Sequence, residues 1–213
     1  MYEISKLQYQ VSEDDVNRGR NQATDTIEPD GVELLCSDLG IAHTDVRILM
    51  LAWKMSAAKM GYFTRDEWRN GLPALEEDSM NKLSKALTKL EKKVKKASEI
   101  EFLEFYSYAF KYCLTDGKRD VENESICELL DILLGSWYPA QVGKLVEYLK
   151  FQTDYKVISK DQWMGFYRFC TKVSFPYMKD YDEDNGFYPL IIVNFVEWMK
   201  EGKNSSFHGA YKE

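Results

Sequence analysis

The chain contains the same short pattern twice, and each copy predicts the start of a helix. Residues 62–68 read YFTRDEW, and residues 157–163 read VISKDQW. In both copies a Thr or Ser follows two apolar or aromatic residues, and a Glu or Gln comes three positions later, which is the capping-box pattern. Each copy then places a tryptophan, Trp68 or Trp163, at the same helical position. An extended step, a cap and an exiting helix are typical of EF-hand-like loops, so the pattern predicts helix–loop–helix pairs.

The segment before the first copy predicts the central helix of the chain. Residues 49–60 place leucine, alanine, tryptophan and methionine close to helical spacing, and Thr44 is a candidate cap. We expect Gly61 to end this helix, and Gly71 to end the helix that starts at Thr64, because glycine adopts the left-handed conformation common at helix ends. Methionines and small residues mixed with aromatics could form a shallow slot for a partner's side chain, or they could be plain core.

Helical spacing of apolar residues predicts further helices along the rest of the chain. They cover residues 32–39, 78–97, 99–114, 122–134, 140–153, 159–173 and 188–200. The helix at 78–97 carries a stripe of lysines, which is either a solvated face or a site for an acidic partner or phosphate. The sequence therefore predicts an all-α fold, a helical domain of EF-hand-like helix–loop–helix pairs.

The chain has no complete calcium-binding loop of the EF-hand type. The closest candidate uses the acids Asp180, Asp182 and Asp184, but its glycine, Gly186, is one position late. Ile191 stands where a bidentate glutamate is required, and the loop before the first capping box has alanine and methionine at ligand positions. We therefore expect no bound metal, and a calcium or peptide sensor is only an alternative function.

Charge and hydropathy exclude two classes of partner. The formal net charge is −7 and the pI is near 5.1, so general nucleic-acid binding is disfavoured, because phosphate contacts need lysine and arginine. The negative field suits a basic protein partner instead. Apolar runs all fall short of the roughly 18 residues of a membrane-spanning helix, so we expect no membrane association.

Cysteine and histidine usage predicts reduced thiols and no zinc site. Four cysteines without CxxC spacing indicate buried thiols in a protein of the cytoplasm and nucleus. They are Cys36, Cys113, Cys127 and Cys170. The sequence has two histidines, too few for a zinc cluster, and it has no phosphate loop or nucleophile–base motif. We therefore expect no cofactor and no catalytic residue.

Several stretches, taken in order and spacing, match one known family. The chain resembles the defective-in-cullin-neddylation family, whose domain is also called the potentiating-neddylation domain, over about residues 28–199. The matching stretches are 29–40, 51–54, 63–72, 78–83, 105–110, 158–163, 181–183 and 189–197. The resemblance implies a weakly ordered segment at 1–27, the domain at 28–199 with an EF-hand-like first half and a helical second half, and a tail at 200–213.

The resemblance implies a scaffold without chemistry of its own. Family members bind the conjugating enzyme that carries the ubiquitin-like modifier of cullins, by gripping its acetylated N-terminal methionine as a helix in a groove. They also bind the basic winged-helix region at the cullin C-terminus. Holding both partners orients the charged enzyme towards the acceptor lysine, so the rate gain is proximity. We expect a monomer.

Alignment with the family places the acetyl-methionine pocket on apolar and small residues. They are Val32, Cys36, Ile48, Leu51, Ala52, Met55, Gly61, Phe63, Tyr112 and Ile132. Apolar walls suit an uncharged acetylated terminus, whereas a free terminus would bring a cation into a dry site. The alternative for each residue is plain core packing.

The resemblance places the cullin-binding surface on Asp161, Phe187, Val193 and Asp182. The family has an acidic–alanine–acidic trio there, and Asp161 matches its first member. Phe187 and Val193 depart from the other two, and Asn185 looks like an inserted residue beside them.

These departures leave three interpretations of the cullin-binding surface. The cullin partner has changed towards an apolar contact, the neighbouring acids at 180–184 supply the charge, or cullin binding is weakened or lost. We favour the first two together. Asp161 also has a structural explanation, because an acid in the first turn of a helix interacts favourably with the helix dipole.

Overall fold

The computed structural model describes residues 20–21, 25–75, 80–95, 99–115, 117–183 and 187–208. The chain forms two compact units, Met1–Thr115 and Asp116–Glu213, which we call unit 1 and unit 2 and describe separately. Both are mainly helical, with only short antiparallel strands in the described part, so the predicted all-α fold class is confirmed.

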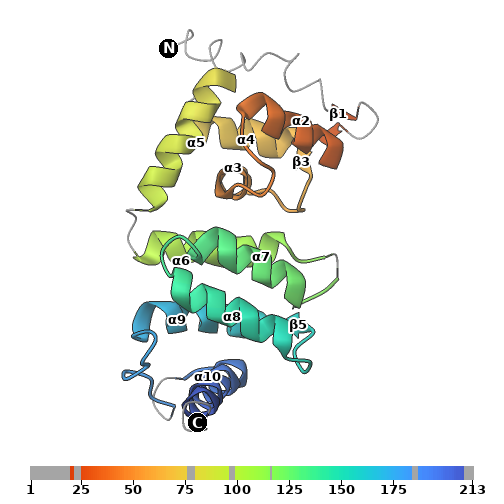
Figure 1. Ribbon diagram of the computed structural model, residues 1–213. Coiled ribbons are helices and arrows are strands. Elements are labelled where there is room, and N and C mark those ends of the chain that lie inside the picture. Colours follow the sequence, from red (N-terminus) through yellow and green to blue (C-terminus); the bar gives the residue numbers. More distant parts are fainter. Residues whose placement is uncertain are drawn as a thin grey trace. The chain divides into compact units, whose positions relative to one another are not determined.

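Unit 1 packs helices around one central helix, α3 (Figure 1). Its helices are α2 (Pro29–Leu39), α3 (Val46–Met55), α4 (Arg65–Leu75), α5 (Met80–Val94) and α6 (Glu99–Tyr112). Its strands are β1 (Arg20–Asn21), β2 (Thr26–Ile27) and β3 (Phe63–Thr64), in the order β1-β2-β3. Helices α4, α5 and α6 each contact α3.

The small sheet of unit 1 fastens the chain before α2 to the step before α4. Ile27 pairs with Phe63, and both side chains are buried. The sequence predicted a weakly ordered segment through residue 27, so β1 and β2 were not expected. Residues 1–19 lie outside the described part of the chain.

Helix α3 is shorter at both ends than the sequence predicted. Its cap is Asp45, whose carboxylate accepts the backbone N–H of Arg47 at 2.9 Å, and the prediction of Thr44 was wrong. The helix ends at Met55, because Ser56 adopts the left-handed conformation (φ 54°) and bonds back to the last turn. The prediction that Gly61 ends it was therefore wrong, and residues 56–62 form a loop.

Helix α4 continues through Gly71, where the sequence predicted its end. A Cβ added at Gly71 would lie 2.7 Å from the Cα of Met55, so this glycine allows α4 to approach α3 closely. The residue serves packing between helices, which a sequence pattern cannot distinguish from a helix stop.

Unit 2 contains two helix pairs and one short two-stranded sheet. Its helices are α7 (Asn123–Leu134), α8 (Pro139–Phe151), α9 (Lys160–Lys172) and α10 (Leu190–His208). Strand β4 (Val121–Glu122) pairs antiparallel with β5 (Val157–Ile158), and α7 contacts α8 while α9 contacts α10. Helix α10 continues past residue 200, where the sequence predicted a tail.

Both predicted capping boxes are confirmed. The Thr64 N–H donates to Glu67 Oε2 at 2.7 Å, and the Glu67 N–H donates to Thr64 Oγ1 at 3.2 Å. Ser159 and Gln162 make the same reciprocal pair at the start of α9. The tryptophans that follow them are buried, at 5% exposure for Trp68 and 0% for Trp163.

The four cysteines, all in the described part of the chain, form no disulfide, and three of them are buried as predicted. Cys113 is half-buried, with its Sγ 3.5 Å from the Sδ of Met60, so the prediction of burial was wrong for this residue. Within the described ranges, no helix is long and apolar enough to cross a membrane, and no group of metal-binding side chains is found.

We predict opposite effects for two alanine substitutions at helical glycines. Gly71→Ala should lower the free energy of unfolding by about 1–3 kcal/mol, because the new methyl group overlaps the backbone of Met55. Gly143→Ala in α8 is the matched control, since nothing lies within 4 Å of its added Cβ. It should stabilise the protein by up to about 1 kcal/mol through helix propensity. Urea denaturation measures both, and equal stability of the two variants would contradict the packing role of Gly71.

Candidate functional site

Most of the residues predicted to line the acetyl-methionine pocket lie in the core of unit 1. Helix α2 supplies two of them, α3 four, β3 one and α6 one. These side chains are at most 7% exposed, and they are Val32, Cys36, Ile48, Leu51, Ala52, Met55, Phe63 and Tyr112. Gly61 is half-buried in the loop after α3, and Ile132 is half-buried on α7 in unit 2. The unit 1 residues therefore share an apolar core, and Tyr112 connects this core to the loop at 56–62 through its hydrogen bond with Gly61.

Side chains from two helices fix that loop, which we call the α3–α4 loop (residues 56–62). The Tyr108 hydroxyl donates to the carbonyl of Ala57 at 2.9 Å. The N–H of Gly61 donates to the Tyr112 hydroxyl at 3.2 Å. Both tyrosines lie on α6 and stack on each other, with ring centroids 5.6 Å apart. The two tyrosine hydroxyls therefore hold the backbone of the loop at Ala57 and Gly61.

Glu67 fixes the same loop from α4. Its Oε2 accepts the N–H of Thr64 in the capping box, and its Oε1 accepts the N–H of Ala58 at 2.8 Å. The capping pattern predicted the first bond, but no sequence signal indicated the second. One carboxylate thus begins a helix and closes the loop before it.

Gly61 has a conformational role in the loop instead of a helix-ending role. Its φ is 77°, in the left-handed region that glycine tolerates, and a Cβ there would lie 3.6 Å from the Cγ of Pro29. Pro29 is the first residue of α2, so the loop approaches the N-terminal end of this helix. Val32, a candidate pocket residue, lies in the same first turn. Met60, beside Gly61, is 56% exposed at the surface of this region.

The core beneath the loop is uncharged at neutral pH. Burial raises the pKa of the Tyr112 hydroxyl to about 12 and also raises the pKa of Tyr108. Burial likewise raises the pKa of the Cys36 thiol. These groups stay neutral at physiological pH, so the walls suit an apolar ligand and disfavour a cation.

The residues predicted for cullin binding lie in unit 2, and Arg168 connects two of them. Its Nη2 lies 3.5 Å from the Oδ1 of Asp161, and its Nη1 donates to the carbonyl of Phe187 at 3.1 Å. The side chain of Asp161 is 77% exposed, and Phe187 is 83% exposed. The sequence comparison did not single out Arg168, because a lone arginine on a helix carries no motif.

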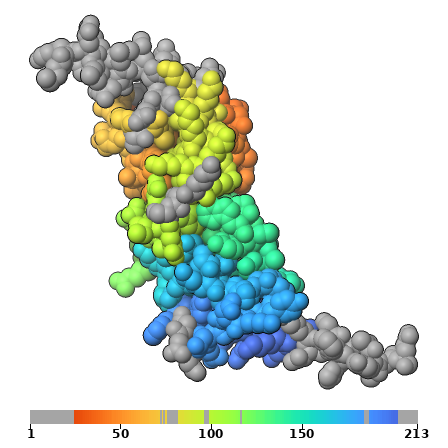
Figure 2. Space-filling model, turned by 90° about the vertical axis from the view of Figure 1, so that its left-hand side faces the viewer, coloured from red at the N-terminus to blue at the C-terminus, as the bar shows by residue number. Residues whose placement is uncertain are grey.

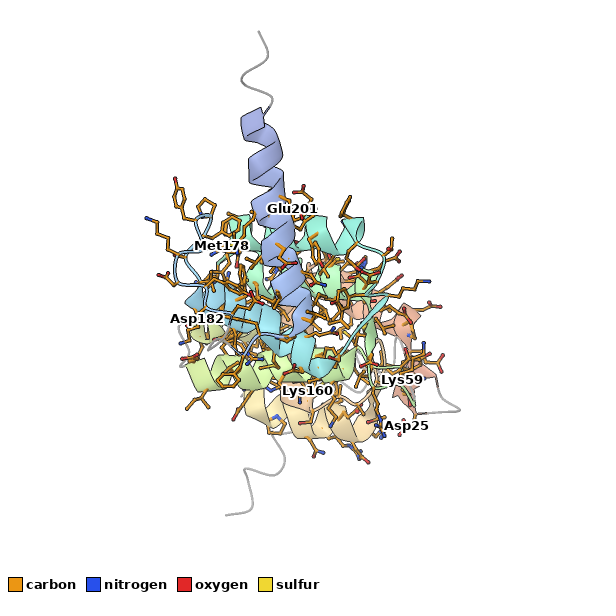
Figure 3. The ribbon with its side chains drawn as sticks, turned by 90° about the horizontal axis from the view of Figure 1, so that it is seen from below. Asp25, Lys59, Lys160, Met178, Asp182 and Glu201 are labelled. Atoms are coloured by element: carbon orange, nitrogen blue, oxygen red, sulfur yellow. The ribbon has the colours of Figure 1, made fainter. Side chains whose placement is uncertain are left out.

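The two other predicted residues differ in exposure. Val193 is half-buried on α10, whereas Asp182 is exposed on the segment that joins α9 to α10. Figure 3 labels Asp182 and Met178 on this segment, and Lys160 at the start of α9. A Cβ added at Gly165 would lie 2.8 Å from the Cδ of Pro189, so the segment packs closely against α9.

The lysine stripe of α5 is exposed, as both interpretations of it require. Helix α5 lies at the surface of unit 1 (Figure 2), with Leu83, Leu87 and Leu90 buried. The exposed lysines of the described stripe are Lys82, Lys85, Lys89, Lys92, Lys93 and Lys95. The Nζ of Lys93 lies 3.7 Å from the Oε1 of Glu101, so an acid of unit 1 partly balances the positive charge of the stripe.

Comparison with known proteins decides the family of this chain. A family model described as "Cullin binding" matches residues 82–198, which is more than half of the chain. The chain belongs to the cullin-binding family. The matched range contains Asp161, Phe187 and Val193, and the resemblance found in the sequence is confirmed.

Relatives named DCN1-like proteins match most of this chain. DCN1-like protein 4 of Danio rerio is 34% identical over 181 residues, which is 85% of this chain and 62% of the relative. DCN1-like protein 4 of Homo sapiens is 33% identical, covering 85% of this chain and 60% of the relative. DCN1-like protein 5 of Homo sapiens is 33% identical, and the match covers 85% of this chain and 74% of the relative. The chain thus matches less than two thirds of the two DCN1-like protein 4 relatives.

We predict that Asp45→Ala lowers the free energy of unfolding by about 1 kcal/mol near neutral pH, because α3 loses its cap. Hydrogen bonding to Arg47 holds the pKa of Asp45 below its ordinary value of 3.8. The contribution of Asp45 is therefore fully present above about pH 4, and it is lost as pH falls through the folded-state pKa. Urea denaturation at neutral and acidic pH should show the difference between wild type and variant shrinking in acid.

Asp38→Ala is the control for Asp45. Asp38 is exposed in the last turn of α2, and the described residues show no hydrogen bond or ion pair to it. Its removal takes a negative charge from a helix C-terminus, so stability should stay within about 0.5 kcal/mol of wild type. A stability difference for Asp45→Ala that stays constant through acidic pH would contradict the role of its charge.

We predict that Tyr108→Phe destabilises the α3–α4 loop, because the carbonyl of Ala57 loses its donor. The expected cost is about 1 kcal/mol, with faster amide hydrogen exchange at residues 57–61. Tyr62→Phe is the matched control, since the described residues show no hydrogen bond to its hydroxyl and its ring contact with Lys59 persists. Equal exchange rates in the two variants would exclude a tether at Tyr108.

Proposed function

We propose that this protein promotes cullin neddylation as a scaffold without catalytic residues of its own. It would bind the modifier-conjugating enzyme through that enzyme's acetylated N-terminus, and the cullin through its C-terminal winged-helix region. Membership of the cullin-binding family is the observation that carries the proposal. The names of the relatives, DCN1-like proteins 4 and 5, support the same assignment.

The acetylated N-terminus is the ligand that best fits the chemistry of unit 1. The candidate pocket residues there are apolar side chains and a tyrosine whose raised pKa keeps it neutral. A methionine side chain and an acetyl group bring no charge into such a core, whereas a free α-amino group would have to be desolvated. The α3–α4 loop, with Met60 exposed on it, is the side from which a peptide would enter.

A basic cullin surface is the partner that best fits the charge of the chain. The net charge is −7, and exposed acids gather on the segment between α9 and α10. Opposite charge steers the encounter between two proteins and fixes their orientation more than it adds affinity. The segment lies inside the range that matches the family model.

The gain in rate would come from proximity. A scaffold that holds the charged enzyme and the cullin at once converts a bimolecular step into an effectively unimolecular one. This requires two separate surfaces, and the candidate residues fall on unit 1 and unit 2 accordingly, with Ile132 as the exception.

The test is calorimetry with the N-terminal peptide of the same organism's neddylation conjugating enzyme, in acetylated and unacetylated forms. We expect the acetylated peptide to bind at least about tenfold more tightly, because the free amine carries its charge into an apolar site. Binding of neither peptide by a folded protein would overturn the pocket assignment.

A reconstituted reaction tests the scaffold role. The protein should accelerate modifier transfer to the cullin, and competing acetylated peptide should remove the acceleration. Peptide binding without any acceleration would mean that this chain has kept the pocket and lost cullin binding.

A further inference from the structure

One aromatic residue of unit 2 is both exposed and held on a strained backbone. Phe187 is 83% exposed, and its φ of 47° lies in the left-handed region. A bulky residue rarely adopts this conformation, and an exposed ring recovers none of its cost through burial. Strain that the surrounding structure enforces is characteristic of functional positions.

Contacts of Phe187 and of the two residues that follow it hold this part of the backbone. Arg168 donates to its carbonyl at 3.1 Å. The ring of the next residue, Tyr188, stacks on Tyr181 at 5.3 Å between centroids, and Pro189 packs against α9. The backbone that follows Phe187 is therefore held in place, and the exposed ring of Phe187 contrasts with the half-buried ring of Tyr188.

The surroundings of Phe187 combine apolar surface with acids. Leu190, at the start of α10, is 66% exposed. In the described part of the segment before Phe187, the exposed Lys179 is outnumbered by the exposed acids Asp180, Asp182 and Glu183. Asp161 is the acid that Arg168 approaches, at 3.5 Å, so its charge is partly neutralised within the surface.

We propose that Phe187 and Leu190 form an apolar anchor, which inserts into a hollow with a basic rim on the cullin C-terminal region. This inference rests on the proposed function and names the contact that replaces the family's acidic–alanine–acidic trio in this chain. The acids meet the basic rim, and the aromatic ring takes the desolvated centre, where interface energy is concentrated. Arg168 is a positioning residue, and Asp161 acts through it.

Rigid presentation explains why the chain tolerates the strain. A side chain that is already fixed in its bound conformation loses little entropy on association. An exposed phenylalanine on a freely moving segment would lose that advantage.

The decisive variant is Phe187→Gly, because stability and binding should change in opposite directions. Glycine relieves the left-handed strain, so Tm should rise by about 2–4 °C. Removal of the ring should raise the Kd for the recombinant cullin C-terminal domain by about 30-fold. Phe187→Ala keeps the strain, so it should weaken binding to the same extent without the rise in Tm.

Phe151→Ala is the matched control for loss of an exposed aromatic ring. Phe151 is 70% exposed on α8 and contacts the ring of Trp198. Its truncation should leave the cullin Kd within about twofold of wild type. An equal loss of affinity in Phe151→Ala and Phe187→Ala would overturn the anchor.

The positioning role of Arg168 has its own readout. Arg168→Ala should weaken cullin binding by about 5- to 10-fold in the wild-type background, and by less than about twofold in the Phe187→Ala background. Additive effects of the two substitutions would show that Arg168 does not act through Phe187.

The outcomes separate this inference from the proposed function. A wild-type protein that binds the acetylated peptide but no cullin C-terminal domain overturns both the anchor and the cullin half of the proposed function. If the wild-type protein and Phe187→Ala bind the cullin domain with equal Kd, the anchor alone is overturned.

Discussion

The carboxylate of Glu67 is the interaction on which the local structure of unit 1 depends. It accepts the N–H of Thr64 at the start of α4 and the N–H of Ala58 in the preceding loop. A charged acceptor makes stronger hydrogen bonds than a neutral one, and two backbone donors share it here. Its bonds keep the α3–α4 loop in register with β3, and β3 in turn pairs with β2 beside α2.

Unit 2 solves the same problem with an amide in place of a carboxylate. Gln152, at the end of α8, donates to the carbonyl of Tyr155 at 2.9 Å and accepts the N–H of Tyr155 at 2.7 Å. In a calcium-binding EF-hand the ion organises the loop by gathering its oxygens. In this chain, side chains that bond to the backbone organise both loops, which explains how the helix–loop–helix arrangement persists without a complete ion site.

The fold class, the capping boxes and the family were predictable because they rest on local periodicity and spacing, as at Thr64 and Ser159. Errors arose where tertiary contacts override local preference. Gly71 resembles a helix stop but accommodates Met55, and Ser56 ends α3 although it is no typical terminator. The tether at Tyr108 and the bridge at Arg168 join residues far apart in sequence or without any motif, so only the folded chain reveals them.

The division of the chain after Thr115 has an evolutionary consequence. Most of the candidate pocket residues belong to unit 1, whereas the surface around Phe187 belongs to unit 2. Substitutions that share no packed neighbours combine almost independently. Under the proposed function, substitutions around Phe187 would alter the proposed cullin contact without replacing any candidate pocket residue of unit 1, so a lineage could co-evolve that contact with its own cullins.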